Sequence, residues 1–167
     1  MGIKTIGLGE SKNIIALSNS AGAVSKTLTA AESGSLITIS PDSGTSSRHI
    51  LITLPAAAAG LTYSFVIIAN SGNTANDIKF TSPSTDNDID GLLIGKEASN
   101  TNVGVTAAAT CALQIDSGNG NTYQYSRWTC TCDGTNWLLQ DAIFQIAVSA
   151  AGTASTKELI FSNAVLT

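Results

Sequence analysis

The stretch Trp128-Thr-Cys-Thr-Cys-Asp133-Gly134-Thr-Asn-Trp137-Leu-Leu139 predicts a β-hairpin. Asp-Gly between two β-patterned runs favours a two-residue type I′ turn, because that turn needs positive φ at both of its central positions. With Asp133 and Gly134 as the loop, the residues of the two strands are brought into register. The expected opposite pairs are Cys132 with Thr135, Cys130 with Trp137 and Trp128 with Leu139.

This register also predicts which side chains of the hairpin share a face, because side chains alternate along a strand. The face with both tryptophans is the more apolar one, and we expect it to belong to the core. Its members are Trp128, Cys130, Trp137 and Leu139, with Thr129, Thr131 and Asn136 on the opposite side.

Most other apolar runs are short, rich in β-branched residues and ended by Gly, Asn, Asp, Ser or Pro, which is typical of an all-β protein. We therefore expect an all-β fold, an antiparallel β-sandwich or a jelly-roll-like domain. Pro55–Gly60, with four alanines, has room for about one helical turn and is interpreted as a corner joining two strands. The expected strands are Leu36–Ser40, His49–Leu54, Thr62–Ala69, Ile78–Thr81, Cys111–Asp116, Tyr123–Cys132, Asn136–Gln140 and Ile143–Val148.

The two ends of the chain differ from the middle. Residues 1–27 alternate short apolar pieces with Gly, Ser and Asn, without a steady period. Residues 149–167 begin with small residues and finish with the apolar Leu159-Ile160-Phe161. We expect a β domain over residues 28–148, flanked by an N-terminal arm and by a C-terminal arm or edge strand that order on a neighbour. The alternative is that both ends are ordinary edge strands of the domain.

Charged residues are scarce. Asp, Glu, Lys and Arg make up 12% of the 167 residues, against about 25% in an average domain. The Lys and Arg residues are scattered, which excludes the basic patch that a nucleic-acid partner requires. No stretch approaches the ~18 uninterrupted apolar residues of a membrane span. The composition instead indicates a protein that hides much of its surface in an assembly.

One polar stripe is a candidate contact surface. If no bulge intervenes before Trp128, then Tyr123, Tyr125 and Arg127 project from the face opposite that tryptophan. Tyr and Arg are favoured at protein interfaces, so the stripe is a candidate subunit or partner contact. The alternative is that these three residues are ordinary side chains of a sheet surface.

One segment has the spacing of a calcium-binding loop. Asp86, Asp88 and Asp90 precede Gly91, and Glu97 stands at the twelfth position. The flanking sequence does not fit, because Pro83 and Ser84 stand where a leading helix belongs. The context favours an acidic surface turn, so no cofactor is expected. The alternative is a non-helical calcium site, which would make the chain a calcium-dependent binding domain built on Asp86–Glu97.

Catalytic patterns are missing from the sequence. His49 is the only histidine, so a two-histidine metal site is excluded, and no Gly-x-Ser-x-Gly or Ser-x-x-Lys motif occurs. The three cysteines are an odd number, which fits buried thiols in a protein made and kept in a reducing cytoplasm. We expect a protein that is not an enzyme.

Three segments together resemble a known group of proteins. The three segments are Leu28-Thr-Ala-Ala-Glu-Ser-Gly-Ser-Leu-Ile-Thr-Ile, Ile52-Thr-Leu-Pro-Ala-Ala-Ala-Ala-Gly-Leu-Thr-Tyr-Ser-Phe and Cys132-Asp-Gly-Thr-Asn-Trp. In this order, over about residues 28–140, they resemble small β-rich virion proteins of tailed phages, namely capsid decoration (cement) proteins and related head-fibre or tail-fibre modules. The resemblance implies a β-sandwich or jelly-roll-like fold, usually a homotrimer, without cofactor or catalytic residues.

The resemblance implies a location and a partner. The protein would be made in the host cytoplasm and would sit on the capsid surface of the virion, bound to the major capsid protein, with residues 1–27 as a main contact. The alternative is a tail-fibre or receptor-binding module that recognises host surface glycans through Tyr123, Tyr125 and loop acids.

Overall fold

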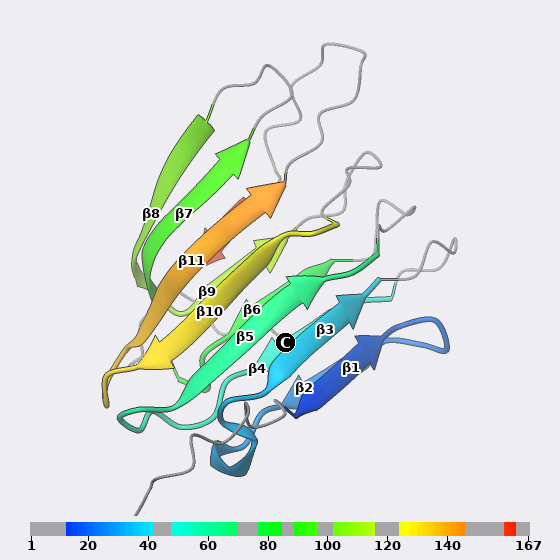
Figure 1. Cartoon of the computed structure of the whole chain (residues 1–167), viewed down its shortest axis with the longest axis horizontal. Coiled ribbons are helices and arrows are strands. Elements are labelled where there is room, and N and C mark those ends of the chain that lie inside the picture. The colour runs from blue at the N-terminus through cyan, green and yellow to red at the C-terminus, as the bar shows by residue number, and fades with distance from the viewer. Residues whose placement is uncertain are drawn as a thin grey trace, which may run out of the picture.

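Two β-sheets packed face to face make up the described part of the computed structural model, with the seven-stranded sheet in front of the five-stranded one in Figure 1. The structure describes residues 13–41, 48–69, 77–84, 89–96, 102–115, 124–145 and 159–162. The seven-stranded sheet has the order β1 (Ile14–Ser18), β3 (Leu36–Ser40), β5 (Thr62–Ile67), β10 (Arg127–Cys132), β11 (Trp137–Gln145), β7 (Ile89–Lys96) and β8 (Asn102–Thr110). The five-stranded sheet has the order β12 (Leu159–Ser162), β9 (Ala112–Ile115), β6 (Ile78–Thr81), β4 (Ile50–Thr53) and β2 (Val24–Thr27).

The first six strands alternate between the two sheets. β1, β3 and β5 lie parallel in one sheet, while β2, β4 and β6 lie parallel in the other. The chain therefore winds as a flattened spiral in which each turn adds one strand to each sheet. In register, Ile14 lies beside Leu36 and Leu36 beside Ser64, and Val24 lies beside Ile50.

The all-β prediction is confirmed, but the expected antiparallel arrangement is wrong for this half of the chain. Antiparallel pairs occur in the second half, where β10 pairs with β5 and β11, β7 with β8, and β9 with β6 and β12. The physical reason lies in the connections: segments such as 28–35 and 54–61 carry the chain across the roughly 10 Å between two packed sheets, which a tight hairpin turn cannot do.

The corner predicted at Pro55–Gly60 is one of these connections, because it leads from β4 in one sheet to β5 in the other. It contains no helical turn. Gly60 has φ 84°, and its N–H donates to the carbonyl of Cys132 at 2.9 Å. The corner is thereby bonded to the end of β10.

The hairpin between β10 and β11 exists, but its turn differs from the expected one. Cys132 pairs with Trp137, so four residues form the turn, and among them only Gly134 has positive φ. The Asp133 carboxylate accepts the N–H groups of Thr135 and Asn136, each at 2.8 Å, and these bonds lower the pKa of Asp133. The turn is therefore held by a side chain and is not type I′.

The face predicted for the hairpin is confirmed, since the register is shifted by two residues and a shift of two keeps every side chain on its side. Trp128, Cys130, Trp137 and Leu139 are all buried. All three cysteines are buried and free, as expected, and burial raises the pKa of Cys130 well above its usual value.

A stack of aromatic rings forms the centre of the core. Trp128 lies between Phe65 and Phe144, with ring centroids 5.0 and 5.4 Å apart and the planes nearly parallel. Phe80 of the other sheet meets Phe65 and Trp128 edge-on, at 5.0 and 5.9 Å. Such offset and edge-to-face pairs each contribute about 0.5–1.5 kcal/mol beyond the area they bury.

The ends of the chain form edge strands where the structure describes them. β1 and β2 are the edge strands at one end of the two sheets, and Leu17 of β1 belongs to the core. Of the two interpretations of residues 1–27, β1 and β2 correspond to the alternative of edge strands, because their apolar residues continue the stacked rows of β3 and β4. β12 is the edge strand of the five-stranded sheet, which agrees with the C-terminal alternative. Residues 1–12 and most of 149–167 lie outside the described residues.

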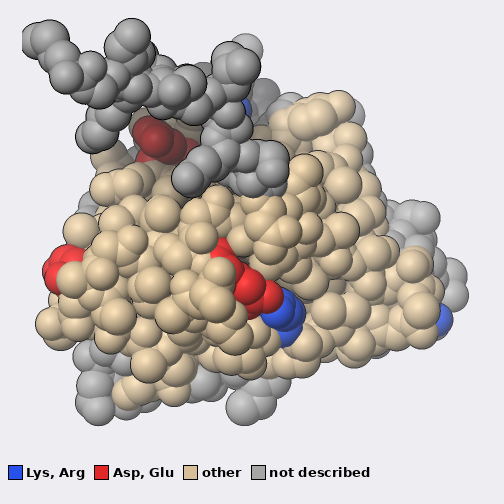
Figure 2. All heavy atoms as spheres, turned by 60° about the horizontal axis from the view of Figure 1, so that its bottom comes forward, with Lys and Arg blue, Asp and Glu red and all other residues tan. Residues whose placement is uncertain are grey.

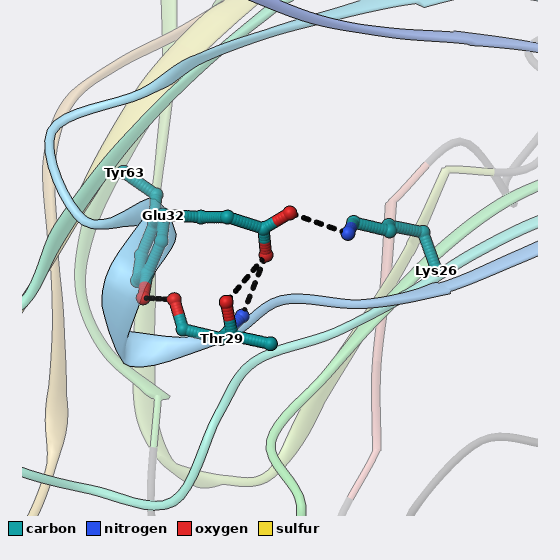
Figure 3. A network of polar contacts seen from close by, with 4 residues as sticks. All are labelled: Lys26, Thr29, Glu32 and Tyr63. Carbon is teal, nitrogen blue, oxygen red and sulfur yellow. Dashed lines mark hydrogen bonds and ion pairs between the residues drawn. The ribbon is translucent and has the colours of Figure 1, made fainter. Parts of the chain in front are cut away.

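A small network of hydrogen bonds and one ion pair lies beside β2 (Figure 3). The Glu32 carboxylate accepts the N–H and hydroxyl of Thr29 at 2.8 and 2.9 Å and pairs with the Lys26 ammonium at 2.5 Å. The hydroxyl of Tyr63 donates to the Thr29 carbonyl at 2.7 Å. The 3₁₀ turn Ala30–Glu32 is thereby tied to strands of both sheets.

A bulge crosses the seven-stranded sheet at β11. Gln140 of β11 pairs with Thr129 of β10, and Ile143 pairs with Arg127. Between these pairs, Asp141 and Ala142 of β11 stand opposite the single residue Trp128 of β10. Asp141 has φ 51°, in the left-handed region. On the other side β7 approaches closely, and a Cβ on Gly91 would lie 2.7 Å from the carbonyl oxygen and the Cβ of Leu139.

We expect Gly91→Ala to lower the free energy of unfolding by about 1–3 kcal/mol, because the added methyl group forces the backbones of β7 and β11 apart. Denaturant unfolding measures this loss. Gly22→Ala is the control, since a methyl group there meets nothing within 4 Å. Equal losses in the two variants would contradict the close approach of the strands.

We expect the stability difference between the wild type and Glu32→Gln to depend on pH. In the folded state the pKa of Glu32 is lowered. The main cause is the hydrogen bond from the Lys26 ammonium, and the hydrogen bonds from Thr29 lower it further. The stabilisation is therefore present above the unfolded-state pKa of about 4.3 and is lost as the pH falls through the lower folded-state pKa. Thermal unfolding at a series of pH values, with Lys26→Met as the matched variant, measures it. A difference that does not change with pH would exclude the charge of Glu32 as its cause.

Candidate interaction surface

The outward-facing surfaces of the two sheets differ in chemistry. All large apolar side chains that the described residues expose lie on strands of the seven-stranded sheet or on residues that directly continue them. The outer surface of the five-stranded sheet exposes none among the described residues. These exposed side chains are Ile14, Ile68, Leu92, Ile94, Tyr125, Leu138 and Ile143.

We call the outer surface of the larger sheet the seven-strand face. It is formed by alternate residues of β1, β3, β5, β10, β11 and β7, because their other residues point into the core. Several of its side chains are strongly exposed: Ile14 by 63% and Leu92 by 56%. Its members include Ile14, Leu36, Thr62, Ser64, Val66, Leu92, Ile94, Arg127, Thr129, Thr131, Leu138, Gln140, Asp141 and Ile143.

The polar side chains at the centre of this face bond to one another. Ser64 lies 3.4 Å from Thr129 across β5 and β10, and Thr62 lies 3.3 Å from Thr131. Thr131 in turn donates to Gln140 of β11 at 3.3 Å. The ladder is neutral and already partnered, so covering it costs less than covering free polar groups.

Two opposite charges stand on the seven-strand face beside this ladder. Arg127 and Asp141 are both exposed, and neither side chain forms an ion pair or hydrogen bond with another described residue. They line a hollow of about 260 Å³ together with Leu36, Ser64, Val66 and Thr129. The hollow lies beside the bulge, which places Asp141 at its rim.

The interface candidates from the sequence fall partly on this face. Arg127 lies on it and is exposed, and Tyr125 is 64% exposed in the turn before β10, with φ 71°. Tyr123 lies outside the described residues. A role of these side chains in a contact stays a prediction.

Sequence reasoning missed the apolar part of the face. Asp90, Leu92 and Ile94 alternate outward on β7 with a buried Ile89, which is a strand signal. The sequence predicts an acidic turn at Asp90-Gly91 and a strand or turn at Leu92–Ile94, and neither prediction gives the outward face of this segment. Asp141 was missed because a bulge leaves no clear sequence signature.

The described part of the segment with the spacing of a calcium-binding loop is an extended strand. Asp90 belongs to β7, which runs straight on to Lys96, about 20 Å further along at 3.3 Å per residue. A calcium loop must fold back within that distance. Asp86, Asp88 and Glu97 lie outside the described residues, and the described residues hold no group of three His, Cys, Asp or Glu side chains able to share a metal ion.

The five-stranded sheet carries a smaller hollow of about 220 Å³, lined by residues that include His49, Leu51 and Lys79. Nδ1 of His49 lies 3.5 Å from Oδ2 of Asp77, to which Gln114 donates at 3.0 Å. The single histidine is therefore half-exposed at a strand end and contacts a carboxylate. Ser25 also lines this hollow, but it forms no hydrogen bond with His49.

Figure 2 shows how sparse charge is on the side of the molecule it presents: one red and one blue group touch near the middle, and the few others stand apart on wide uncharged areas. Among the described residues no helix is long and apolar enough to cross a membrane. Comparisons of the chain with protein-family models, with curated proteins and with solved structures give no match.

We expect Leu92→Thr combined with Ile94→Thr to change the free energy of unfolding by no more than about 0.5 kcal/mol per site, because both side chains are exposed and threonine suits a strand. The same variant should elute earlier from a hydrophobic-interaction column. Leu54→Ala, in the core, is the contrast and should cost about 2–5 kcal/mol. A large loss of stability in the threonine variant would show that these side chains are buried within the folded chain.

Proposed function

We propose that this chain is a structural virion protein: a capsid decoration (cement) protein of a phage head, with two-layer β-sandwich architecture, that binds and stabilises the shell as a homotrimer. The observation that carries the proposal is the seven-strand face, on which the exposed large apolar side chains of the described residues gather. Four of these side chains, Leu92, Ile94, Leu138 and Ile143, lie on the neighbouring strands β7 and β11, and exposed apolar side chains grouped in this way mark interaction sites.

The chemistry of the face suits an assembly. Its centre is a ladder of neutral hydroxyl and amide groups, and its flanks are aliphatic, so few charges lose their hydration when it is covered. An overall charge content of 12% fits a protein that works in contact with other subunits. The resemblance of residues 28–140 to small phage virion proteins supports the same function.

Cementing needs no catalysis. A protein that binds only the assembled shell, and not its dissociated subunits, stabilises the shell by mass action. The major capsid protein is the partner in this proposal, and the site of action is the outer surface of the virion.

The proposal predicts that the purified protein cosediments with phage heads that lack it and raises the temperature at which they disassemble. Leu92→Glu combined with Ile94→Glu should weaken this binding at least tenfold, because each placed charge would lose its hydration in the contact. Thr27→Glu is the matched control, since it adds a charge to an exposed position of the five-stranded sheet.

Two results would contradict the proposal: wild-type protein that does not bind heads, or glutamates on the seven-strand face that bind as well as Thr27→Glu. The same assay with residues 1–12 removed tests whether the part of the expected arm that precedes β1 contributes to the contact.

A tail-fibre or receptor-binding module is the second candidate. The hollow at Arg127 and Asp141 favours it, because a guanidinium, a carboxylate and the hydroxyls of Ser64 and Thr129 are groups that bind sugar hydroxyls. Specific binding to host polysaccharide on a glycan array, lost in Asp141→Asn, would select this function over the first.

A further inference from the structure

We propose that copies of this chain associate through their seven-strand faces, with Arg127 of one copy paired to Asp141 of the next. The inference goes beyond the proposed function: it gives a contact that pairs two copies, and this contact and the shell compete for the seven-strand face.

The two charges have no partner among the described residues. Arg127 begins β10, and Asp141 lies in the bulge between the pairs Thr129–Gln140 and Arg127–Ile143. They line the same hollow, yet their charged groups are not within 4 Å of each other. Asp141 is held at φ 51°, a conformation that costs free energy in a non-glycine residue and recurs at functional positions.

The surface around the charges has the character of an interface. Leu36 and Val66 line the hollow, and Ile143 and Leu138 lie exposed on β11. The six strands from β1 to β7 span about 24 Å at 4.8 Å per spacing, and five residues along each strand span about 17 Å. This flat footprint is about 400 Å², about half of the roughly 800 Å² of accessible surface that one partner contributes to a stable contact, before the relief of the side chains is counted.

Charge complementarity identifies the partner as a second copy. If an apolar partner covered this face, Arg127 and Asp141 would both lose their hydration, at a cost of several kcal/mol for each charge. A second copy brings one charge of each sign to the same place, so reciprocal pairing satisfies both. The face is therefore complementary to itself, as a two-fold contact between two copies requires.

The test is a charge exchange followed by light scattering coupled to size exclusion. The wild type should have a mass at least twice that of the 17.0 kDa chain. Arg127→Asp alone and Asp141→Lys alone should each reduce the mass to that of one chain, because each juxtaposes like charges. The double variant Arg127→Asp/Asp141→Lys should recover the larger mass, since it restores the pair with reversed polarity.

Two variants control for misfolding and for unspecific charge effects. Asp141→Asn removes the charge and keeps a residue that tolerates the left-handed conformation, and it should weaken association with an unchanged circular dichroism spectrum. Thr27→Asp, on the other sheet, should leave the mass unchanged.

A wild type that is a single chain at the highest concentration reached overturns the inference, and so does a double variant that stays folded but monomeric. The outcome is separable from the proposed function. Shell binding with a monomeric wild type would refute this contact alone, whereas an oligomer with the recovered double variant that ignores phage heads would refute the cement function alone. A wild-type dimer would support the contact and exclude the trimer.

Discussion

Phe80 of the five-stranded sheet meets Phe65 and Trp128 of the seven-stranded sheet edge-on, and this contact joins the two layers. Trp128 is stacked on both sides within its own sheet, so the rings of three neighbouring strands act as one block. Because side chains alternate along a strand, the inward placement of these rings also fixes which residues of their strands face outward. The chemistry of the outer surface is therefore set by the packing of the core.

The bulge at Asp141 connects this core to the candidate contact surface. Two residues of β11 stand opposite Trp128 alone, and Gly91 allows β7 to follow the displaced strand closely. Without the extra residue, one of the two segments of β11 would turn its apolar side chains outward. The bulge keeps Leu139 and Phe144 both in the core, and it leaves Asp141 at the surface beside Arg127.

The structure shows on which surface the uncharged side chains of this charge-poor chain gather. Exposed aliphatic side chains and a neutral hydroxyl ladder gather on one sheet, while the other sheet exposes no large apolar side chain among the described residues. Such asymmetry suits a protein with one face toward neighbouring subunits and another toward solvent. The proposed cement function and the pairing of copies both use this one surface, so the two contacts compete for it.

The all-β class could be predicted from the sequence, and so could the hairpin at Asp133-Gly134 with its buried face. These features follow from the local alternation of side chains and from turn chemistry. Only the tertiary structure decided that β1 to β6 wind in parallel between two sheets, since a strand's partner lies one full turn of the chain away and leaves no local signal. The same holds for the surface. Tyr125 and Arg127 could be found by residue type, whereas Leu92, Ile94 and Asp141 joined them only through the register of β7 and the bulge in β11.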